Sequence, residues 1–298
     1  MKRLMLCLTV LLLLTFGCAC AEEAADITGQ CKFTASYRDK LFRLTDGKRN
    51  QPFEVPKKRD MWVEGTLPES SPAFGLYLTW TSAPTPTSVE IWNGTGFEPF
   101  AVCGDRGLSH EYVALPGAAR FRLSPLEGRE MNLTELQVFS AGDLPGWVQD
   151  WQPTAAKADI LLVSAHPDDE YIFFGGLIPF YTAVRQKQVT VCYLTYASEE
   201  RLHELLDGLW TAGQRQYPVL LPFRDLFSRT LDKGYAIWGR DAVLDTLADV
   251  INRLQPEVVV AHDLQGEYGH GAHRVSGDAC LPLIRDSERA LSWQPKKL

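Results

Sequence analysis

The stretch DILLVSAHPDDE, residues 159–170, decides the fold of the C-terminal half. Its first part is a nearly continuous apolar run, which is typical of a strand buried on both faces of a parallel sheet. The second part changes abruptly to polar side chains, among them His166, Asp168 and Asp169. In open parallel sheets, ligands bind beyond the carboxyl ends of the strands. The stretch therefore predicts a central strand with a binding site at its end.

The rest of this half alternates between apolar runs and helix-like segments. Two further buried strands are expected at 189–194 and 257–261. Helices are expected at about 170–186, 201–212 and 241–254, and the last has apolar residues recurring every three or four positions. Strands that alternate with helices imply a parallel sheet with right-handed crossovers. We therefore expect an α/β domain.

A second polar cluster, HDLQGEYGHGAH at residues 262–273, follows the expected strand 257–261. His166 and Asp169 offer one imidazole and one carboxylate, and either His270 or His273 can add a third ligand. Two histidines, one carboxylate and a water are a common catalytic zinc set. Asp168 remains free to take a proton from the water. A protonated histidine beside the site can stabilise an oxyanion or protonate a leaving amine.

The two clusters together resemble those of the PIG-L/LmbE-like family of N-acetylglucosaminyl deacetylases, over about residues 156–298. The resemblance implies a Rossmann-like fold and zinc-dependent removal of an acetyl group from an amino sugar. By position, His166, Asp169 and His273 match the zinc ligands of that family, and Asp168 matches its general base. His270 matches the histidine that polarises the carbonyl or protonates the amine. Arg201 resembles an arginine that contacts substrate in relatives.

Two features depart from the family pattern. Many relatives have an acidic residue just before the last metal-binding histidine, where this chain has Ala272. We expect Asp263 or Glu267 to tune His270 in its place. Relatives also continue beyond the position of Leu298 into another strand, so the resemblance suggests a C-terminally truncated chain.

The N-terminal half has short apolar runs separated by turn residues, such as 74–80, 89–92 and 136–139, which predicts an all-β sandwich. It resembles the discoidin-type (coagulation-factor type C) family. The resemblance rests on LTDG at 44–47 and on MNLTELQVF at 131–139. It implies a galactose-binding-like jelly roll, and we expect this half to bind cell-wall or other polysaccharide without doing chemistry.

The first 21 residues have the pattern of a secretory signal: a basic start, an apolar run over 4–16, and a small-x-small cleavage site ending at Ala21. The protein is therefore expected to be secreted or on the cell surface, with no membrane span after processing. Lipid attachment at Cys18 or Cys20 is the alternative. The expected organisation is a signal peptide at 1–21, a sandwich at 22–142, a linker at 143–155 and a deacetylase domain at 156–298.

The formal net charge of −7 argues against nucleic acid as a partner, because nucleic-acid surfaces select clustered Lys and Arg. In an exported protein Cys31 and Cys103 are the plausible disulfide pair, and Cys192 is expected to be a buried thiol. The sequence thus predicts an exported zinc-dependent hydrolase that removes N-acetyl groups from an N-acetylglucosamine-type glycan. The alternatives are a carbohydrate-binding protein with an inactive deacetylase-like domain, and a zinc amidase or esterase with another substrate.

Overall fold

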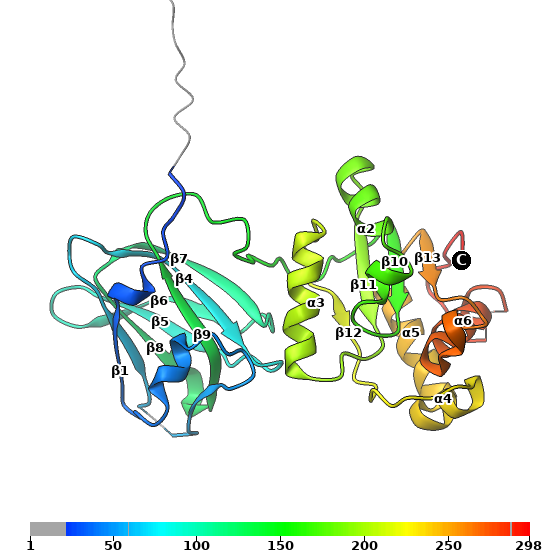
Figure 1. The fold of residues 1–298 in the computed structure, drawn as a ribbon, viewed down its shortest axis with the longest axis horizontal. Helices are drawn as coiled ribbons and strands as arrows, with labels where there is room; N and C mark the ends of the chain where they lie inside the picture. The colour runs from blue at the N-terminus through cyan, green and yellow to red at the C-terminus, as the bar shows by residue number, and fades with distance from the viewer. Residues whose placement is uncertain (1–21, 59, 287) are drawn as a thin grey trace, which may run out of the picture.

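The computed structural model describes residues 22–58, 60–286 and 288–298. The expected signal segment and the candidate lipidation sites Cys18 and Cys20 lie outside these ranges. The chain combines antiparallel β-sheets in its N-terminal half with a parallel sheet and helices in its C-terminal half (Figure 1). In the described part of the chain, no helix is both long and apolar enough to cross a membrane.

The N-terminal half contains two antiparallel sheets. One has the strand order β1-β3-β8-β5-β6 and the other the order β2-β9-β4-β7. The strands are β1 (Lys32–Ala35), β2 (Phe53–Val55), β3 (Val63–Thr66), β4 (Ala73–Trp80), β5 (Thr87–Trp92), β6 (Phe97–Cys103), β7 (His110–Ala118), β8 (Arg120–Pro125) and β9 (Met131–Phe139). Short helical turns, η1 (Thr28–Gln30), η2 (Leu41–Thr45) and η3 (Leu126–Gly128), connect some of them.

Side chains from both sheets form one hydrophobic core, so the sheets pack face to face. Val63, Phe121 and Leu123 come from the first sheet, and Leu76 and Leu136 from the second. Their alternation with polar residues along each strand is what a half-buried sheet requires. The predicted all-β half is thus built of antiparallel sheets, and its assignment as a jelly roll stays a prediction.

The expected disulfide between Cys31 and Cys103 is wrong, because both residues are free thiols in the structure. Cys31 directly precedes β1 and Cys103 ends β6, and these strands are the two edges of the five-stranded sheet. Four strand spacings of ~4.8 Å place the edges roughly 19 Å apart. A disulfide needs Cα atoms within about 7 Å. Cys192 is a fully buried free thiol, as expected.

The C-terminal half is built on a parallel sheet of order β12-β11-β10-β13, so β10 is central. Its elements are β10 (Ile160–Ser164), α1 (Asp169–Ile172), α2 (Leu177–Pro179), η4 (Phe180–Val184), β11 (Val189–Tyr193), α3 (Glu199–Thr211), β12 (Val219–Leu220), α4 (Leu231–Trp238), α5 (Arg240–Leu254), β13 (Val258–Ala261), η5 (Glu267–Gly269) and α6 (Gly271–Ile284). The three predicted strands are present and pair in parallel.

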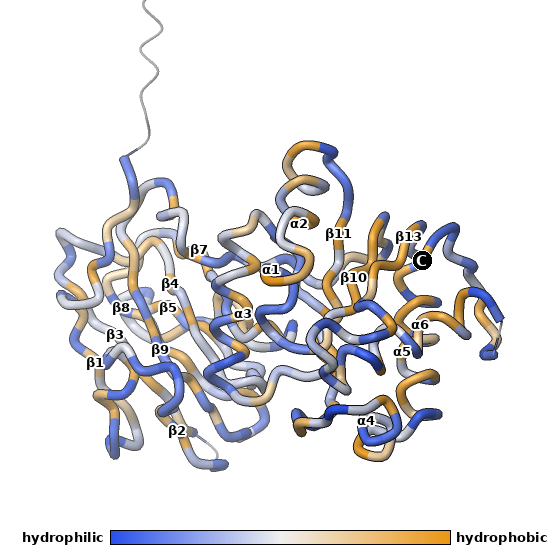
Figure 2. The backbone as a smooth tube through the Cα atoms, turned by 45° about the vertical axis from the view of Figure 1, so that its right-hand side comes forward, coloured by the Kyte–Doolittle hydropathy of each residue, from blue (hydrophilic) through white to orange (hydrophobic). Residues whose placement is uncertain are grey.

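Helices cover both faces of this sheet. Leu161 and Val163 of β10 pack with α5 and α6, whereas Ile160 and Leu162 pack with α3 on the other face. Figure 2 shows the hydrophobic residues concentrated along β10 and β13. Burial on both faces explains why these strands are continuous apolar runs.

The single helix expected over 170–186 is wrong. The structure has three short pieces there, α1, α2 and η4. Gly175 and Gly176 lie at the break between the first two, where their low helix propensity removes the reason for one continuous helix. The helices α4 and α6 lie outside the helices expected from the sequence.

The two halves meet along α3 (Figure 1). Trp151 is fully buried there and packs edge-on against Trp210 and Tyr217. Tyr217 reaches across with its hydroxyl group to Ser109 of the sandwich half, at 3.1 Å from Oγ. The segment between the halves is therefore packed against the α/β half.

Candidate metal centre

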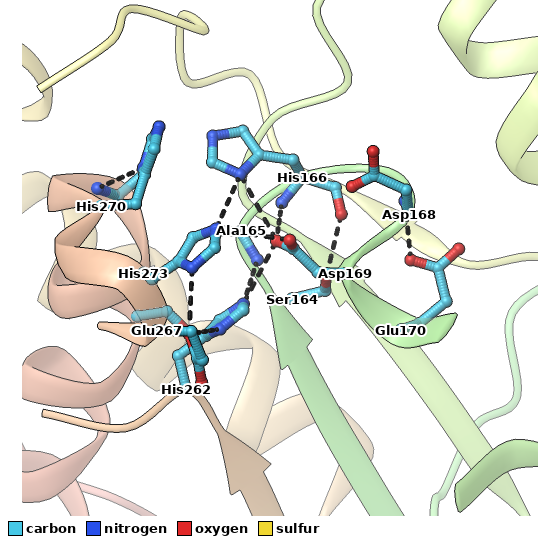
Figure 3. A network of polar contacts seen from close by, with 12 residues as sticks. Ser164, Ala165, His166, Asp168, Asp169, Glu170, His262, Glu267, His270 and His273 are labelled. Carbon is cyan, nitrogen blue, oxygen red and sulfur yellow. Dashed lines mark hydrogen bonds and ion pairs between the residues drawn. The ribbon is translucent and has the colours of Figure 1, made fainter. Parts of the chain in front are cut away.

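The two polar clusters meet at the carboxyl end of the parallel sheet, as expected (Figure 3). Residues 165–170 follow β10 and residues 262–273 follow β13, which is its direct neighbour. The helix α6 brings His273 to the same point. Gly277 allows this close packing, since a Cβ atom there would lie 2.3 Å from the carbonyl oxygen of His262.

Three side chains bring potential ligand atoms close to one another. His166 Nδ1 lies 3.3 Å from His273 Nε2 and 3.3 Å from Asp169 Oδ2. His273 Nε2 also lies 3.3 Å from the other carboxylate oxygen, Asp169 Oδ1. Atoms bound tetrahedrally at about 2.0–2.1 Å from one zinc ion would lie about 3.3–3.4 Å apart. The residues therefore fit zinc, and they are the three predicted from the sequence.

Asp169 is held as a carboxylate. Its side chain is almost fully buried, and burial alone would raise its pKa. Hydrogen bonds with the imidazoles of His166, His262 and His273 outweigh the burial and hold the pKa well below its ordinary value. The backbone N–H of His166 also donates to Oδ2 at 2.8 Å. An ionised, buried carboxylate among imidazoles is the donor set that a divalent cation requires.

Glu267, which is not one of the three potential ligands, contacts two of the histidines. Glu267 Oε2 lies 2.9 Å from His273 Nδ1 and 2.6 Å from His262 Nδ1. If Nδ1 of His273 carries the proton toward this carboxylate, its Nε2 lone pair faces the other two ligands. Metal-binding histidines commonly have such a carboxylate partner, which fixes the tautomer and the ring orientation. Glu267 therefore orients His273. The carboxylates that act on the His270 ring are those of Asp169 and Asp225, in place of the expected Asp263 or Glu267.

His262 was in the second predicted cluster but had no assigned role. Its side chain is fully buried, and Nε2 lies 3.2 Å from Asp169 Oδ2. Asp169, His262 and His273 form a second group of potential ligands, and His166, His270 and His273 form another. His273 belongs to both groups, and each group shares two residues with the set His166, Asp169 and His273, so all three sets describe one centre.

Asp168 lies next to this centre with an unusual backbone. Its φ of 104° is a conformation that residues other than glycine rarely adopt. Its carboxylate is half exposed and pairs with Arg201 of α3, at 3.1 Å from Nη2. Arg201 also donates to the carbonyl of Pro167. The arginine predicted to contact substrate thus holds the loop that carries Asp168.

Glu170 anchors the same loop from inside. It is buried, and its Oε2 accepts a hydrogen bond from the backbone N–H of Asp168 at 3.0 Å. Burial raises the pKa of Glu170 to about 7. Asp168 therefore has both its backbone and its side chain held by neighbouring groups.

His270 caps the N-terminus of α6, where Nδ1 accepts from the backbone N–H of Ala272 at 3.2 Å. The neutral ring then carries its proton on Nε2. Burial, followed by the nearby imidazoles of His166 and His273, lowers its pKa to about 4. His270 is thus a neutral hydrogen-bond donor near neutral pH.

Aromatic side chains that the sequence reasoning did not assign surround the centre. Tyr268 is 77% exposed and its ring lies 5.3 Å from that of His273, and the exposed Phe227 lies 5.1 Å from His270. Phe173 contacts the ring of His273 from another side. Of these aromatic residues, only Tyr268 lies within the second polar cluster, so only its position in the sequence could have pointed to a place beside the centre.

Comparison with known proteins agrees with this location. Residues 161–284 match the family model described as PIG-L, GlcNAc-PI de-N-acetylase. One relative is a 1D-myo-inositol 2-acetamido-2-deoxy-alpha-D-glucopyranoside deacetylase from Catenulispora acidiphila, 32% identical over 44% of this chain and 50% of its own length. Another is a probable N-acetylglucosaminyl-phosphatidylinositol de-N-acetylase from Dictyostelium discoideum, 29% identical over 45% of this chain and 52% of its own.

The chain spans about half the length of these two relatives. Among solved structures, a protein titled CpGH89CBM32-6 from Clostridium perfringens is 14% identical over 39% of this chain and 97% of its own, with a TM-score of 0.33. The family match and the sequence relatives show that residues 161–284 of this chain form a PIG-L domain.

Proposed function

We propose that this protein is a zinc-dependent N-deacetylase that acts on an N-acetylglucosamine-type glycan or glycoconjugate. The observation that carries the proposal is the set of 3.3 Å distances that join the potential ligand atoms of His166, Asp169 and His273, a spacing that suits one tetrahedral zinc ion. The relatives named above are deacetylases of 2-acetamido sugars. The reaction splits the amide C–N bond with one water and yields acetate and a free amine.

Zinc, when bound, supplies Lewis-acid chemistry toward the acetyl carbonyl and the attacking water. Asp168 is the general base of the proposal and takes one proton from the water. Its ion pair with Arg201 and its backbone contact with Glu170 hold the carboxylate in place beside the centre. Positioned proton transfer contributes typically about 10²–10⁴-fold to a rate.

His270 polarises the carbonyl in this scheme. The resemblance implied two roles, carbonyl polarisation or protonation of the amine. Nδ1 accepts from Ala272, so Nε2–H is the group available to the substrate. A neutral donor aimed at a developing oxyanion stabilises the transition state, and removal of one such donor costs about 10²–10³-fold in kcat. The geometry therefore favours carbonyl polarisation.

Export and attachment belong to the same proposal. Cleavage after Ala21 would release the mature chain to the cell exterior, and lipid attachment at Cys18 or Cys20 is the alternative. The antiparallel half, proposed as a jelly roll at 22–142, would hold the enzyme on polysaccharide and so raise the local substrate concentration. The α/β half, proposed as Rossmann-like over 156–298, would carry the chemistry.

Acetate release from a panel of N-acetylated sugars and glycans tests the proposal. The zinc-loaded protein should release acetate, and both chelator-treated protein and Asp168→Asn should release little. Binding of glycans without acetate release would favour the carbohydrate-binding alternative. Hydrolysis of simple amides or esters in preference to every sugar would favour the other zinc-hydrolase alternative.

A further inference from the structure

A cavity of about 490 Å³ lies between the two halves, apart from the metal centre. One wall is residues 47–51, the loop between η2 and β2 of the sandwich half. The other wall is the first part of α3, with Glu200, His203, Glu204 and Asp207. Its size is within the range of small-molecule sites, about 300–1,000 Å³. Each half supplies one wall, so neither half forms it alone.

The wall of this cavity contains a buried imidazole nitrogen without a partner. His203 is only 2% exposed, and its Nε2 atom has no hydrogen-bond partner among the described residues. Its Nδ1 atom lies 2.9 Å from His110 Nε2, and His110 Nδ1 lies 2.6 Å from the hydroxyl oxygen of Tyr77. A buried imidazole nitrogen without a partner is costly unless something else fills that role.

Tyr77, His110 and His203 form a buried chain of hydrogen bonds whose direction depends on the tautomers of the two histidines. Burial lowers the pKa values of both His110 and His203, so each neutral ring carries one proton. In either tautomer the Nε2 atom of His203 has one unmet hydrogen bond, as a donor or as an acceptor. A sugar hydroxyl group can both donate and accept, so it satisfies this nitrogen in either case.

The charges on the walls limit what the ligand can be. Lys48 and Arg49 face Glu200, Glu204 and Asp207, so the carboxylates outnumber the cations. Arg49 already pairs with Asp207 at 2.6 Å, whereas Glu200 has no ion-pair partner in the described structure. A phosphate or sulfate would meet the surplus carboxylates and be repelled. The cavity walls thus carry both hydrogen-bond donors and acceptors, and the amides of Asn50 and Gln51 supply one of each. Such walls suit a polyhydroxylated neutral or amino sugar.

The cavity is next to the proposed general base. Glu204 lines it and accepts a hydrogen bond from Arg201 at 3.3 Å, and Arg201 in turn pairs with Asp168. Residues 200–207 cover about 10 Å along the axis of α3, at about 1.5 Å per residue. The α3 wall of the cavity therefore begins at the end of the helix that carries Arg201, the partner of Asp168.

We propose that this junction cavity, lined by residues 47–51 and by Glu200, His203, Glu204 and Asp207, is a second sugar subsite that binds a neighbouring unit of the glycan being deacetylated. The proposal rests on the proposed deacetylase function. It makes the sandwich half a direct contributor to substrate choice. The preferred substrate is then an oligosaccharide of neutral or amino sugars, and a single sugar is a poorer one.

The experiment compares free N-acetylglucosamine with its β-1,4-linked tetramer as substrates of the full-length protein. The variants are Asn50→Ala, on the sandwich wall, and Glu200→Gln, on the α3 wall, and both residues are exposed. Loss of the charged hydrogen-bond partner in Glu200→Gln should lower the tetramer-to-monomer ratio of kcat/KM about tenfold, and loss of the neutral amide in Asn50→Ala should lower it about fivefold. Glu69→Gln makes the same chemical change as Glu200→Gln at an exposed site outside the cavity, and should leave the ratio within twofold.

A tetramer-to-monomer ratio of kcat/KM that is unchanged in both variants, including the case in which both substrates lose activity equally, would overturn the subsite. If the unaltered protein deacetylates neither substrate, the proposed function fails, and the subsite is tested by calorimetry with the tetramer and metal-free protein. Weaker tetramer binding by Asn50→Ala and Glu200→Gln, but not by Glu69→Gln, still supports the cavity as a sugar site. No measurable tetramer binding by the unaltered protein overturns it.

Discussion

Replacing Glu267 with glutamine should weaken zinc binding without touching a proposed ligand. Glu267 Oε2 faces the Nδ1 atoms of both His262 and His273, and its Oε1 accepts from the backbone N–H of Asp263 at 3.2 Å. A glutamine amide has only one acceptor oxygen. It must therefore turn its NH₂ group either toward the imidazole donors or toward the Asp263 N–H. Both orientations place one donor against another.

The expected loss follows from what such partners do at other metal centres. Removing the carboxylate that orients a metal-binding histidine lowers metal affinity by about 10–100-fold. That corresponds to about 1.4–2.8 kcal/mol. Competition with a chromophoric chelator at neutral pH measures the zinc dissociation constant. Glu69→Gln, at an exposed site, is the matched control.

Two results would refute this reasoning. Zinc affinity within twofold of the unaltered protein would mean that Glu267 does not orient His273. A complete loss of zinc binding in a folded Glu267→Gln protein would mean that Glu267 is itself a ligand. Near-UV circular dichroism checks that the variant keeps its native packing.

Three other predictions concern the base, the junction and export. Asp168→Asn should bind zinc as tightly as the parent protein, yet its kcat, measured by acetate release, should fall about 10²–10⁴-fold. If the variant instead loses zinc and keeps its rate per bound ion, the roles of Asp168 and Asp169 are reversed. Burial lowers the pKa of His203 to about 4, whereas the pKa in the unfolded chain is near 6.5. The free energy of unfolding is therefore constant in this respect above pH 7, and it falls by about 3 kcal/mol as the pH drops toward 4. Urea unfolding of His203→Gln should lack that part of the pH dependence, and an identical dependence would contradict the assignment. Mass spectrometry of the secreted protein should give a mature N-terminus at Glu22, and a diacylglyceryl mass on Cys18 or Cys20 would establish lipid attachment instead.

Much of the site could be predicted because it is carried by local sequence. A buried parallel strand is a continuous apolar run, so its end is visible, and polar residues at two such ends must meet if the strands are neighbours. That reasoning located His166, Asp169 and His273. The residue types alone left the third ligand open between His270 and His273, and the distances of 3.3 Å favour His273.

Other contacts could not be predicted because they depend on packing between distant segments. Glu267 orients His273 only because α6 lies close against the end of β13, which Gly277 permits. The pairing of His110 with His203 joins residues 93 positions apart, across the contact of the two halves. Neither relation leaves a periodic signal in the sequence.

Helix boundaries failed for local reasons. The apolar pattern after Glu170 suggested one helix, but Gly175 and Gly176 interrupt it. The helix α6 contains Gly271, Gly277 and Pro282, whose low helix propensity hid it. Its stability comes from burial, because most of its residues are buried against the sheet and α4.

We propose that His166 Nδ1, the Asp169 carboxylate and His273 Nε2 hold one zinc ion. Anomalous scattering from crystals of the zinc-loaded protein, measured on both sides of the zinc absorption edge, locates the ion directly. We expect a single peak about 2.0–2.2 Å from each of these three groups, with Glu267 outside the coordination sphere. A peak bound through His262 or His270 in place of any of the three, or no peak at this end of the sheet, would contradict it.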